Sequence, residues 1–272
     1  MQRISVTDFE DPRLDDYRNL KDAELLAKRA RFIAEGTGVL RVLLGRSAYQ
    51  PDSILLSERR FRTLEEELGA FDPACPVYVV PQAVMDEVVG FPIHRGCLAA
   101  VPRGEARDPL SLARELLEAK PNPRLVILEG MANLDNVGGI FRNAMGLGGD
   151  AVLLCPRCCD PLYRKAIRTS MGGTLCVPFG KAENLVELLR ALRALGYAVW
   201  AFDPTEPATN LGMPGSEEQG PLALLFGTEG PGLTPAALAE ADLRVRIPME
   251  AGVDSLNVAA AAGIGLFSTR RL

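Results

Sequence analysis

The chain has 272 residues, 47% of them hydrophobic and 24% charged, which is enough for one large or two ordinary globular domains with a sizeable core. Its formal net charge is −5, and neither the first 105 residues nor the remainder is basic, which excludes a module that holds nucleic acid by phosphate neutralisation alone. The most apolar stretch, residues 256–267, is shorter than the about 20 residues of a membrane span, and the charged opening lacks a secretory pattern. We therefore expect a cytoplasmic protein without a membrane partner.

Six cysteines in a chain of this kind are typical of reduced thiols. The C-x-x-C pattern of Cys155 and Cys158 is half of a zinc site or a redox pair, but a structural zinc needs further ligands, and the single histidine, His94, is distant in sequence. We expect incidental thiols and no metal. One histidine also excludes multi-histidine metal catalysis.

Residues 1–105 are predicted to form a compact α/β unit, and residues 106–120 a linker. The expected elements are a helix at 23–35, strands at 39–44 and 54–57, a helix at 58–69, a strand at 77–80, a helix at 82–89 and a strand at 97–101. A helix at 110–119 follows and ends at a Pro-Asn-Pro break.

Residues 121–272 alternate regularly between apolar strands and helices. Strands are expected at 125–128, 151–154, 198–202, 222–226 and 243–247, and helices at 137–147, 161–170, 183–195, 235–241 and 259–267. Near-continuous apolar strands that alternate with helices predict a parallel sheet covered on both faces. Because such sheets bind ligands at the carboxyl ends of their strands, the polar, glycine-rich loops there are the candidate sites.

The loop after the first of these strands leads into a helix through Asn136, a predicted N-cap. Arg142 then lies about a turn and a half into a helix of small and apolar residues. A charge in that setting needs an anionic partner, which is either a ligand or an acid such as Asp135.

The loop after the fourth strand, residues 227–232, is rich in glycine and is followed by Thr234-Pro235, a predicted N-cap with proline at the first helical position. Its spacing is neither that of a dinucleotide fingerprint nor that of a P-loop, so an oxidoreductase or a nucleotide triphosphatase is disfavoured. After the fifth strand, Ser255 is the expected cap of a buried helix, and Asn257 should have a specific hydrogen-bond partner.

Two groups of basic residues are candidates for RNA contact. They are Lys28, Arg29 and Arg31, and then Arg164, Lys165 and Arg168. The second group has helical spacing and can share one face, and a solvated helix surface is the alternative reading.

Together the three loops resemble the signature of the SpoU–TrmH family, within the SPOUT superfamily of RNA methyltransferases. The first loop matches the pattern N-x-G-x-I-x-R-x-A with Asn136, Gly138, Ile140, Arg142 and Ala144. The second loop matches the pattern G-x-E-G-x-G-L with Gly227, Glu229, Gly230, Gly232 and Leu233. The third loop matches I-P-M with residues 247–249 and S-L-N-V-A with residues 255–259. A weaker match is the serine-glycine segment 170–173. Residues 32–36 and 94–99 resemble the family's ribosomal-protein-like substrate-binding module, which makes His94 a structural or RNA-contacting residue.

The resemblance implies a parallel α/β sheet with a C-terminal trefoil knot, a homodimer with active sites at its interface, and S-adenosylmethionine-dependent methylation of a ribose 2′-hydroxyl in rRNA or tRNA. The implied catalytic residues are Arg142, Asn136, Glu229, Ser255 and Asn257. The implied cofactor-binding residues are Gly227, Thr228, Gly230, Ile247, Met249, Ser255 and Leu256. The family often assigns proton removal to the counterpart of Arg142. Because an arginine pKa lies above about 12, we expect Arg142 chiefly to clamp an RNA phosphate and to stabilise the developing alkoxide.

Two other functions stay open at this point. One is a knotted protein that binds RNA or the cofactor without turnover, and the other is a SPOUT enzyme that methylates a base.

Overall fold

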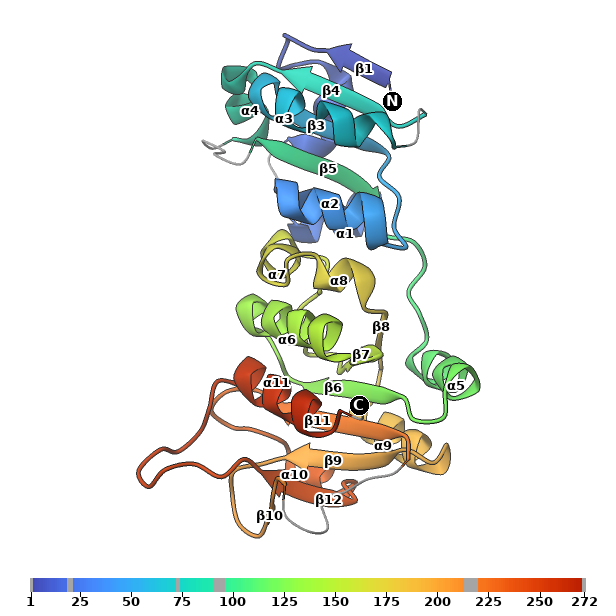
Figure 1. Cartoon of the computed structure of the whole chain (residues 1–272), viewed down its shortest axis with the longest axis vertical. Helices are drawn as coiled ribbons and strands as arrows, with labels where there is room; N and C mark the ends of the chain where they lie inside the picture. The colour runs from blue at the N-terminus through green and yellow to red at the C-terminus, as the bar shows by residue number, and fades with distance from the viewer. Residues whose placement is uncertain (1, 19–21, 72–73, 91–95, 213–219, 271–272) are drawn as a thin grey trace. The chain divides into compact units, whose positions relative to one another are not determined.

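The structure is a computed structural model (Figure 1), and it describes residues 2–18, 22–71, 74–90, 96–212 and 220–270. His94, for which a structural or RNA-contacting role was predicted, lies outside these residues. The chain divides into two compact units. Unit 1 comprises residues 1–105 and 162–176, and unit 2 comprises residues 106–161 and 177–272.

Unit 1 is built on a mixed five-stranded sheet. Its strands are β1 (Gln2–Ser5), β2 (Arg31–Glu35), β3 (Ser53–Ser57), β4 (Pro76–Val80) and β5 (Cys97–Pro102), in the order β1-β4-β3-β5-β2. Strand β5 is antiparallel to both of its neighbours, while β1, β4 and β3 run parallel. Its helices are a 3-10 helix (Pro12–Tyr17), α1 (Asp22–Arg29), α2 (Thr37–Arg46), α3 (Glu58–Gly69), α4 (Gln82–Val89), α7 (Arg164–Thr169) and α8 (Gly173–Cys176). The core includes Ile33, Leu55 and Leu98, one from each of three adjacent strands.

Two predictions for unit 1 were wrong. The helix expected at 23–35 ends at Arg29, and residues 31–35 form β2, whose residues 32–35 are all buried, as in a strand covered on both faces. The strand expected at 39–44 is part of α2. Its buried residues Val39, Leu40 and Leu43 recur at the spacing of one helix face, which an apolar run this short does not distinguish from a strand.

Unit 2 holds a seven-stranded, all-parallel sheet, which confirms the predicted α/β class. Its strands are β6 (Arg124–Glu129), β7 (Ala151–Leu154), β8 (Phe179–Lys181), β9 (Ala198–Phe202), β10 (Thr209–Asn210), β11 (Leu222–Gly227) and β12 (Leu243–Arg246), in the order β10-β12-β9-β11-β6-β7-β8. From β6, the chain adds β7 and then β8 toward one edge of the sheet. It then crosses to the opposite side of β6, where β11 lies between β9 and β6. This change of direction is the kind of switch point at which open parallel sheets bind ligands.

The helices of unit 2 form two groups (Figure 1). Helices α6 (Leu134–Leu147) and α11 (Val258–Ser268) pack against each other, and α11 also contacts β11. Helices α5 (Pro109–Ala119), α9 (Leu185–Ala194) and α10 (Pro235–Ala239) form the second group. The predicted linker at 106–120 therefore holds α5, which unit 2 includes, and the hydroxyl of Tyr197 donates to the carbonyl of Ala113 at 2.9 Å.

Small residues let α6 and α11 pack closely, and the side chains of Asn143 and Arg124 add hydrogen bonds to the pair. A Cβ on Gly139 of α6 would lie 2.8 Å from the Cβ of Ala259 on α11, so the helices are too close there for a side chain. At the other end of the pair, the Arg124 guanidinium donates to the carbonyls of Leu147 and Gly148 at the end of α6, and to that of Leu266 on α11. The Arg124 guanidinium thus donates hydrogen bonds at the negative C-terminal ends of both helices.

Candidate active site

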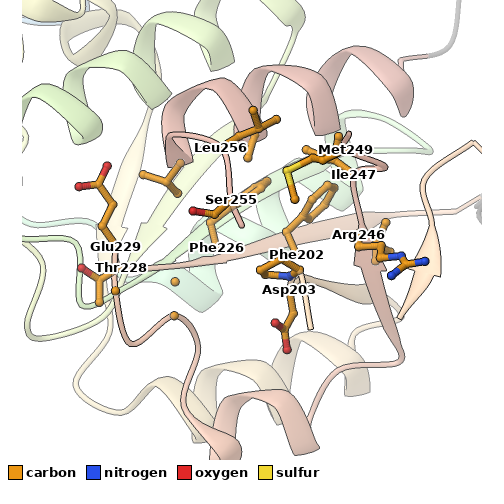
Figure 2. A pocket seen from close by; sticks show the side chains of 17 residues that line it. Phe202, Asp203, Phe226, Thr228, Glu229, Arg246, Ile247, Met249, Ser255 and Leu256 are labelled. Atoms are coloured by element: carbon orange, nitrogen blue, oxygen red, sulfur yellow. The ribbon is translucent and has the colours of Figure 1, made fainter. Parts of the chain in front are cut away.

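A pocket opens at the carboxyl ends of β9, β11 and β12 (Figure 2). The empty space between its walls, including solvent at its mouth, is about 800 Å³. Of the residues predicted to bind a cofactor, all seven line it: Gly227, Thr228, Gly230, Ile247, Met249, Ser255 and Leu256. The pocket therefore lies at the edge of the sheet where the candidate ligand site was expected.

The loop after β11 folds back on itself to form one wall of the pocket. The amide of Gly232 donates to the carbonyl of Thr228 at 3.1 Å, which brings the two ends of the loop together. A Cβ on Gly227 would lie 2.3 Å from the carbonyl carbon of Gly232, so only glycine fits at that position. Gly230 and Gly232 adopt φ angles of 85° and 69°, which side chains rarely tolerate.

Two stacked aromatic rings contribute apolar surface to the pocket. The centroids of Phe202, at the end of β9, and Phe226, near the end of β11, are 4.6 Å apart at an interplanar angle of 27°. Gly265 of α11 lies against Phe202, since a Cβ there would be 2.7 Å from the ring. Figure 2 shows Glu229 and Thr228 at one end of the view of the pocket and Arg246 at the other.

Three predicted catalytic residues meet beside the pocket in one hydrogen-bonded cluster. Glu229 Oε1 accepts from the side-chain amides of Asn136 at 2.9 Å and Asn257 at 3.1 Å, and the Asn257 amide also reaches Asn136 Oδ1 at 2.9 Å. The partner expected for Asn257 is therefore present. We call Asn136, Glu229 and Asn257 the amide–carboxylate cluster.

The structure corrects two predicted helix caps. Asn133, not Asn136, caps α6, because its Oδ1 accepts from the amide of Asp135, and Asn136 is buried in the first turn. Asn257, not Ser255, caps α11 by accepting from the amides of Ala259 and Ala260. Ser255 instead lines the pocket as an exposed residue. The predicted cap of α10 is confirmed, since Thr234 Oγ1 accepts from the amide of Ala237.

Arg142 is the predicted catalytic residue that belongs neither to the pocket lining nor to the amide–carboxylate cluster. It is exposed on α6 and forms no ion pair or hydrogen bond with the described residues. Of the two partners left open for its charge, a ligand or an acid such as Asp135, no acid among the described residues forms an ion pair with it, and its side chain is exposed rather than in an apolar environment. Its guanidinium is thus available to an anion from another molecule.

Both predicted RNA-contacting groups belong to unit 1, and all their members except Lys165 lie near acids. Arg29 contacts Asp16 at 2.7 Å, Arg31 contacts Asp52 at 2.6 Å, and Lys28 lies 3.7 Å from Glu24. In the second group, Arg164 contacts Asp22 at 3.0 Å, Arg164 and Arg168 approach Glu35 at 3.9 Å and 3.6 Å, and Lys165 is exposed.

One buried carboxylate was missed. Glu129 ends β6, is 5% exposed, and accepts from both the amide and the hydroxyl of Thr234 at 2.9 Å and 2.8 Å. It joins the end of β6 to the loop after β11. The available signal was its position, an acid directly after an apolar strand on the ligand-binding edge. Phe202 and Phe226, which close apolar strands at that edge, could have been found by the same criterion.

Among the described residues, no group of three or more histidine, cysteine or acidic side chains is placed to hold a metal ion. No helix within the described part of the chain has the length and apolar character of a membrane span.

Comparison with known proteins agrees with the three motifs. A model of the SpoU rRNA Methylase family matches residues 123–267, just over half of the chain. A tRNA/rRNA methyltransferase of Mycobacterium tuberculosis, itself described as uncharacterised, is 40% identical over 98% of this chain and 91% of its own length. The 23S rRNA (guanosine-2′-O-)-methyltransferase RlmB of Haemophilus influenzae is 30% identical over 79% of this chain and 85% of its own length.

Solved structures show the same fold. An AdoMet-bound rRNA methyltransferase from Sinorhizobium meliloti covers 99% of this chain and 98% of its own with a TM-score of 0.79 at 24% identity. The SpoU methyltransferase AviRb from Streptomyces viridochromogenes, in complex with AdoMet, covers 96% of this chain and 97% of its own with a TM-score of 0.77 at 19% identity. The chain belongs to the SpoU family of RNA methyltransferases, as the sequence motifs predicted.

Proposed function

We propose that this protein transfers a methyl group from S-adenosylmethionine to a ribose 2′-hydroxyl of rRNA or tRNA, with rRNA the first candidate. The observation that carries the proposal is the convergence of all three motif loops on one edge of the sheet, where the pocket and the amide–carboxylate cluster adjoin. The relative from Haemophilus influenzae, which is named as a ribose methyltransferase of 23S rRNA, supports the choice of hydroxyl and of RNA.

The pocket suits a ligand that is part nucleoside and part amino acid. Phe202, Phe226 and Leu256 offer apolar surface, and the glycine-rich loop brings backbone amides and carbonyls close to the cavity. Ile247 and Met249, after β12, line the same cavity. When bound there, S-adenosylmethionine would supply an activated methyl group on its sulfonium. The residues present fit that cofactor.

The amide–carboxylate cluster is proposed to position the reacting ribose. Asn257 uses one end of its amide to cap α11 and the other to hold Glu229, so the first turn of α11 and the loop after β11 keep a fixed relation. Glu229 itself is partly exposed at the pocket, where an ionised carboxylate can accept a hydrogen bond from a ribose hydroxyl. The hydroxyl of Ser255, exposed on the same pocket, is a second positioning contact.

Arg142 is proposed to clamp an RNA phosphate through both arms of its guanidinium and to stabilise the developing alkoxide. Its position outside the pocket of its own chain supports a site that is completed across a homodimer interface. We place that interface on α11 and the loop before it, where Leu256, Ile264 and Phe267 are 38%, 36% and 66% exposed. An uncovered apolar surface of this kind marks an interaction site.

Three further features are proposed from family membership. The C-terminal chain, including α11, passes through a trefoil knot as in the SPOUT fold, and the protein works in the cytoplasm. Unit 1 docks structured RNA, with Lys28, Arg29, Arg31, Arg164, Lys165 and Arg168 as candidate contacts. Because all of these except Lys165 form ion pairs with acids, RNA binding would exchange carboxylate partners for phosphates, which favours specific docking over general electrostatic capture.

The first test is methylation of separate pools of unmodified rRNA and tRNA with labelled S-adenosylmethionine. We expect label in one pool, resistant to alkali at a single internucleotide bond and absent with Arg142→Ala. Arg114→Ala is the matched control, because Arg114 is an exposed arginine on α5 away from the pocket, and it should leave the label unchanged.

The same assay separates the competing functions. Label that persists when the target nucleotide is 2′-deoxy would establish base methylation instead. Cofactor binding without label in either pool would favour a protein that binds without turnover.

A further inference from the structure

Two cysteines that the proposed function does not use lie side by side at the end of β7. The sulfurs of Cys155 and Cys158 are 3.7 Å apart, and both residues are buried. The amide of Cys158 donates to the carbonyl of Cys155 at 3.1 Å, which closes a turn over Pro156 and Arg157. A turn of this kind keeps its end Cα atoms within about 7 Å, and disulfides span about 4.4–6.8 Å. The backbone is therefore compatible with a bond between the two sulfurs.

The thiol pair is tied to the segment that joins β6 to the first motif. Cys155 Sγ accepts from the amide of Gly130 at 3.0 Å, and Cys158 Sγ accepts from the amide of Met131 at 3.4 Å. The single proton of the Cys158 thiol is donated to Cys155 Sγ or to the carbonyl of Leu128, 3.2 Å away.

These contacts make the two sulfurs unequal. The hydrogen bond from Cys158, together with the amide of Gly130, lowers the pKa of Cys155, while the neighbouring Cys155 and burial raise the pKa of Cys158. Burial raises the pKa of the adjacent Cys159 to about 11. Because the thiolate is the nucleophile in disulfide exchange, Cys155 is the attacking sulfur of the three.

We propose that Cys155 and Cys158 form a reversible disulfide by exchange with a low-molecular-weight disulfide such as oxidised glutathione. Cys155 attacks one glutathione sulfur, forms a mixed disulfide and releases the first glutathione thiolate, which takes up a proton. Cys158 then attacks the Cys155 sulfur, its proton passes to the second departing glutathione, and the Cys155–Cys158 bond forms. Two protein thiols are oxidised and one glutathione disulfide is reduced. Pro156 and Arg157 are exposed, so local opening of their turn gives the oxidant access.

Oxidation would change the hydrogen bonds around Gly130. The disulfide removes the proton that Cys158 shares with Cys155 or Leu128, and it replaces a strong acceptor for the Gly130 amide with a weak one. The neighbouring Glu129 holds Thr234 and so connects this segment to the loop after β11. The thiol pair thus lies where a change of redox state reaches the candidate active site.

The test is oxidation of the folded full-length protein in glutathione buffers, followed by acid quenching, alkylation and peptide mapping. We expect two of the six cysteines to lose their reactivity, a linked peptide that joins Cys155 to Cys158, and full recovery with dithiothreitol. Amide exchange at Gly130 should be faster in the oxidised form. Cys159→Ser should still form the bond, whereas Cys155→Ser and Cys158→Ser should not.

Free thiols at both positions in wild-type protein, under buffers that oxidise the unfolded chain, would overturn the proposal, as would a bond made by Cys159. The wild-type map decides this even if a serine variant fails to fold. The measurement requires no methyl transfer, so it is independent of the proposed function.

Discussion

The amide–carboxylate cluster leaves little freedom in how its side chains are oriented. Asn257 Oδ1 accepts from two backbone amides at the start of α11, so its Nδ2 must face Glu229 and Asn136. Asn136 in turn donates to Glu229 and accepts from Asn257. Each amide therefore uses both of its ends, and the orientation of one fixes that of the next.

Asn257→Asp should destabilise the protein by about 2 kcal/mol, because it replaces the donor that faces Glu229 with a second carboxylate oxygen. The cap of α11 survives, since aspartate caps as well as asparagine does. Repulsion raises the folded pKa of one carboxyl above its unfolded value, so the deficit should be greatest at neutral pH and shrink as the pH falls. Urea unfolding at neutral and mildly acidic pH measures this. Asn133→Asp, at the cap of α6, is the control and should be nearly neutral at both.

Arg142→Lys should fold like the wild type, within about 0.5 kcal/mol, because the side chain is exposed and forms no ion pair or hydrogen bond with a described residue. It should nevertheless lose most of its methyl-transfer activity, since an ammonium cannot hold a phosphate through two parallel hydrogen bonds. Turnover rates at saturating RNA and cofactor check this. Nearly full turnover in the lysine variant would contradict the bidentate role.

At the residue scale, sequence motifs identified the cluster but not its geometry. Asn136, Glu229 and Asn257 stood out as polar residues in the three loops, and the structure brings them together. The sequence did not indicate a role for Glu129, because that role depends on hydrogen bonds from Thr234, which is distant in the chain. The two incorrect caps have a local cause: Asn133 and Asn136, and likewise Ser255 and Asn257, are pairs of good cap residues near the same helix start.

At the scale of elements, Arg124 is the main polar link between the ends of α6 and α11. It donates to Leu266 at 2.5 Å, to Leu147 at 2.6 Å and to Gly148 at 2.9 Å. Arg124→Ala should lower the free energy of unfolding by about 2 kcal/mol, because carbonyls at both helix ends lose a charged donor. Chemical denaturation measures the change, and hydrogen exchange should speed up first in the last turns of these two helices. If the free energy of unfolding falls no more than it does in the exposed Arg114→Ala variant, the Arg124 hydrogen bonds do not stabilise the protein.

Because α11 lies close to Gly139 but not to Gly146, a glycine-to-alanine substitution should change stability in opposite directions at these two positions of α6. Gly146→Ala meets nothing within 4 Å and should stabilise α6 by up to about 1 kcal/mol through helix propensity. Gly139→Ala places its Cβ 2.8 Å from that of Ala259, so the helices must move apart and the net change should be destabilising. Thermal unfolding of both variants gives the comparison. Equal stabilisation would mean that the two helices separate at no cost.

The elements of unit 2 were more predictable than those of unit 1 for a physical reason. Strands such as β6 and β11 are buried on both faces, which produces long apolar runs bounded by turns. The short edge strands β8 and β10 leave almost no pattern and were missed. In unit 1, an apolar run of strand length turned out to be one face of α2, and periodicity over so few residues does not separate the two cases.

At the scale of the whole molecule, the exposed apolar residues of α11 predict self-association. If the proposed interface forms, Phe267→Glu should convert a dimer to a monomer and abolish methyl transfer, because it places a charge in that interface and the proposed function has Arg142 act across it. Sedimentation or light scattering measures the mass. Phe9→Glu is the control, since Phe9 is an exposed phenylalanine in unit 1 and should leave the mass unchanged. A wild-type protein that is already monomeric would refute the interface.

The division of the chain into units could not have been deduced from the sequence. Residues 162–176 lie within the stretch matched by the family model, yet they pack in unit 1, where the hydroxyl of Ser47 donates to the carbonyl of Leu175 at 3.0 Å. Gly172 leaves room for Val42, since a Cβ there would be 2.9 Å from that side chain. Amino-acid composition indicates linkers and apolar runs, but it does not indicate which element a helix will pack against.

The order of the pocket residues along the chain also determines when this protein can first act during its own synthesis. Ribosomes extend the chain from its N-terminus, so β6, β7 and α6 are complete before β11, which must come to lie between β6 and β9, has been made. The residues that line the pocket begin only at Phe202, and Asn257, which secures Glu229, comes just before the last helix. The pocket wall of a nascent chain therefore stays incomplete until α11, which supplies Val258 and Ala261, has emerged from the ribosome.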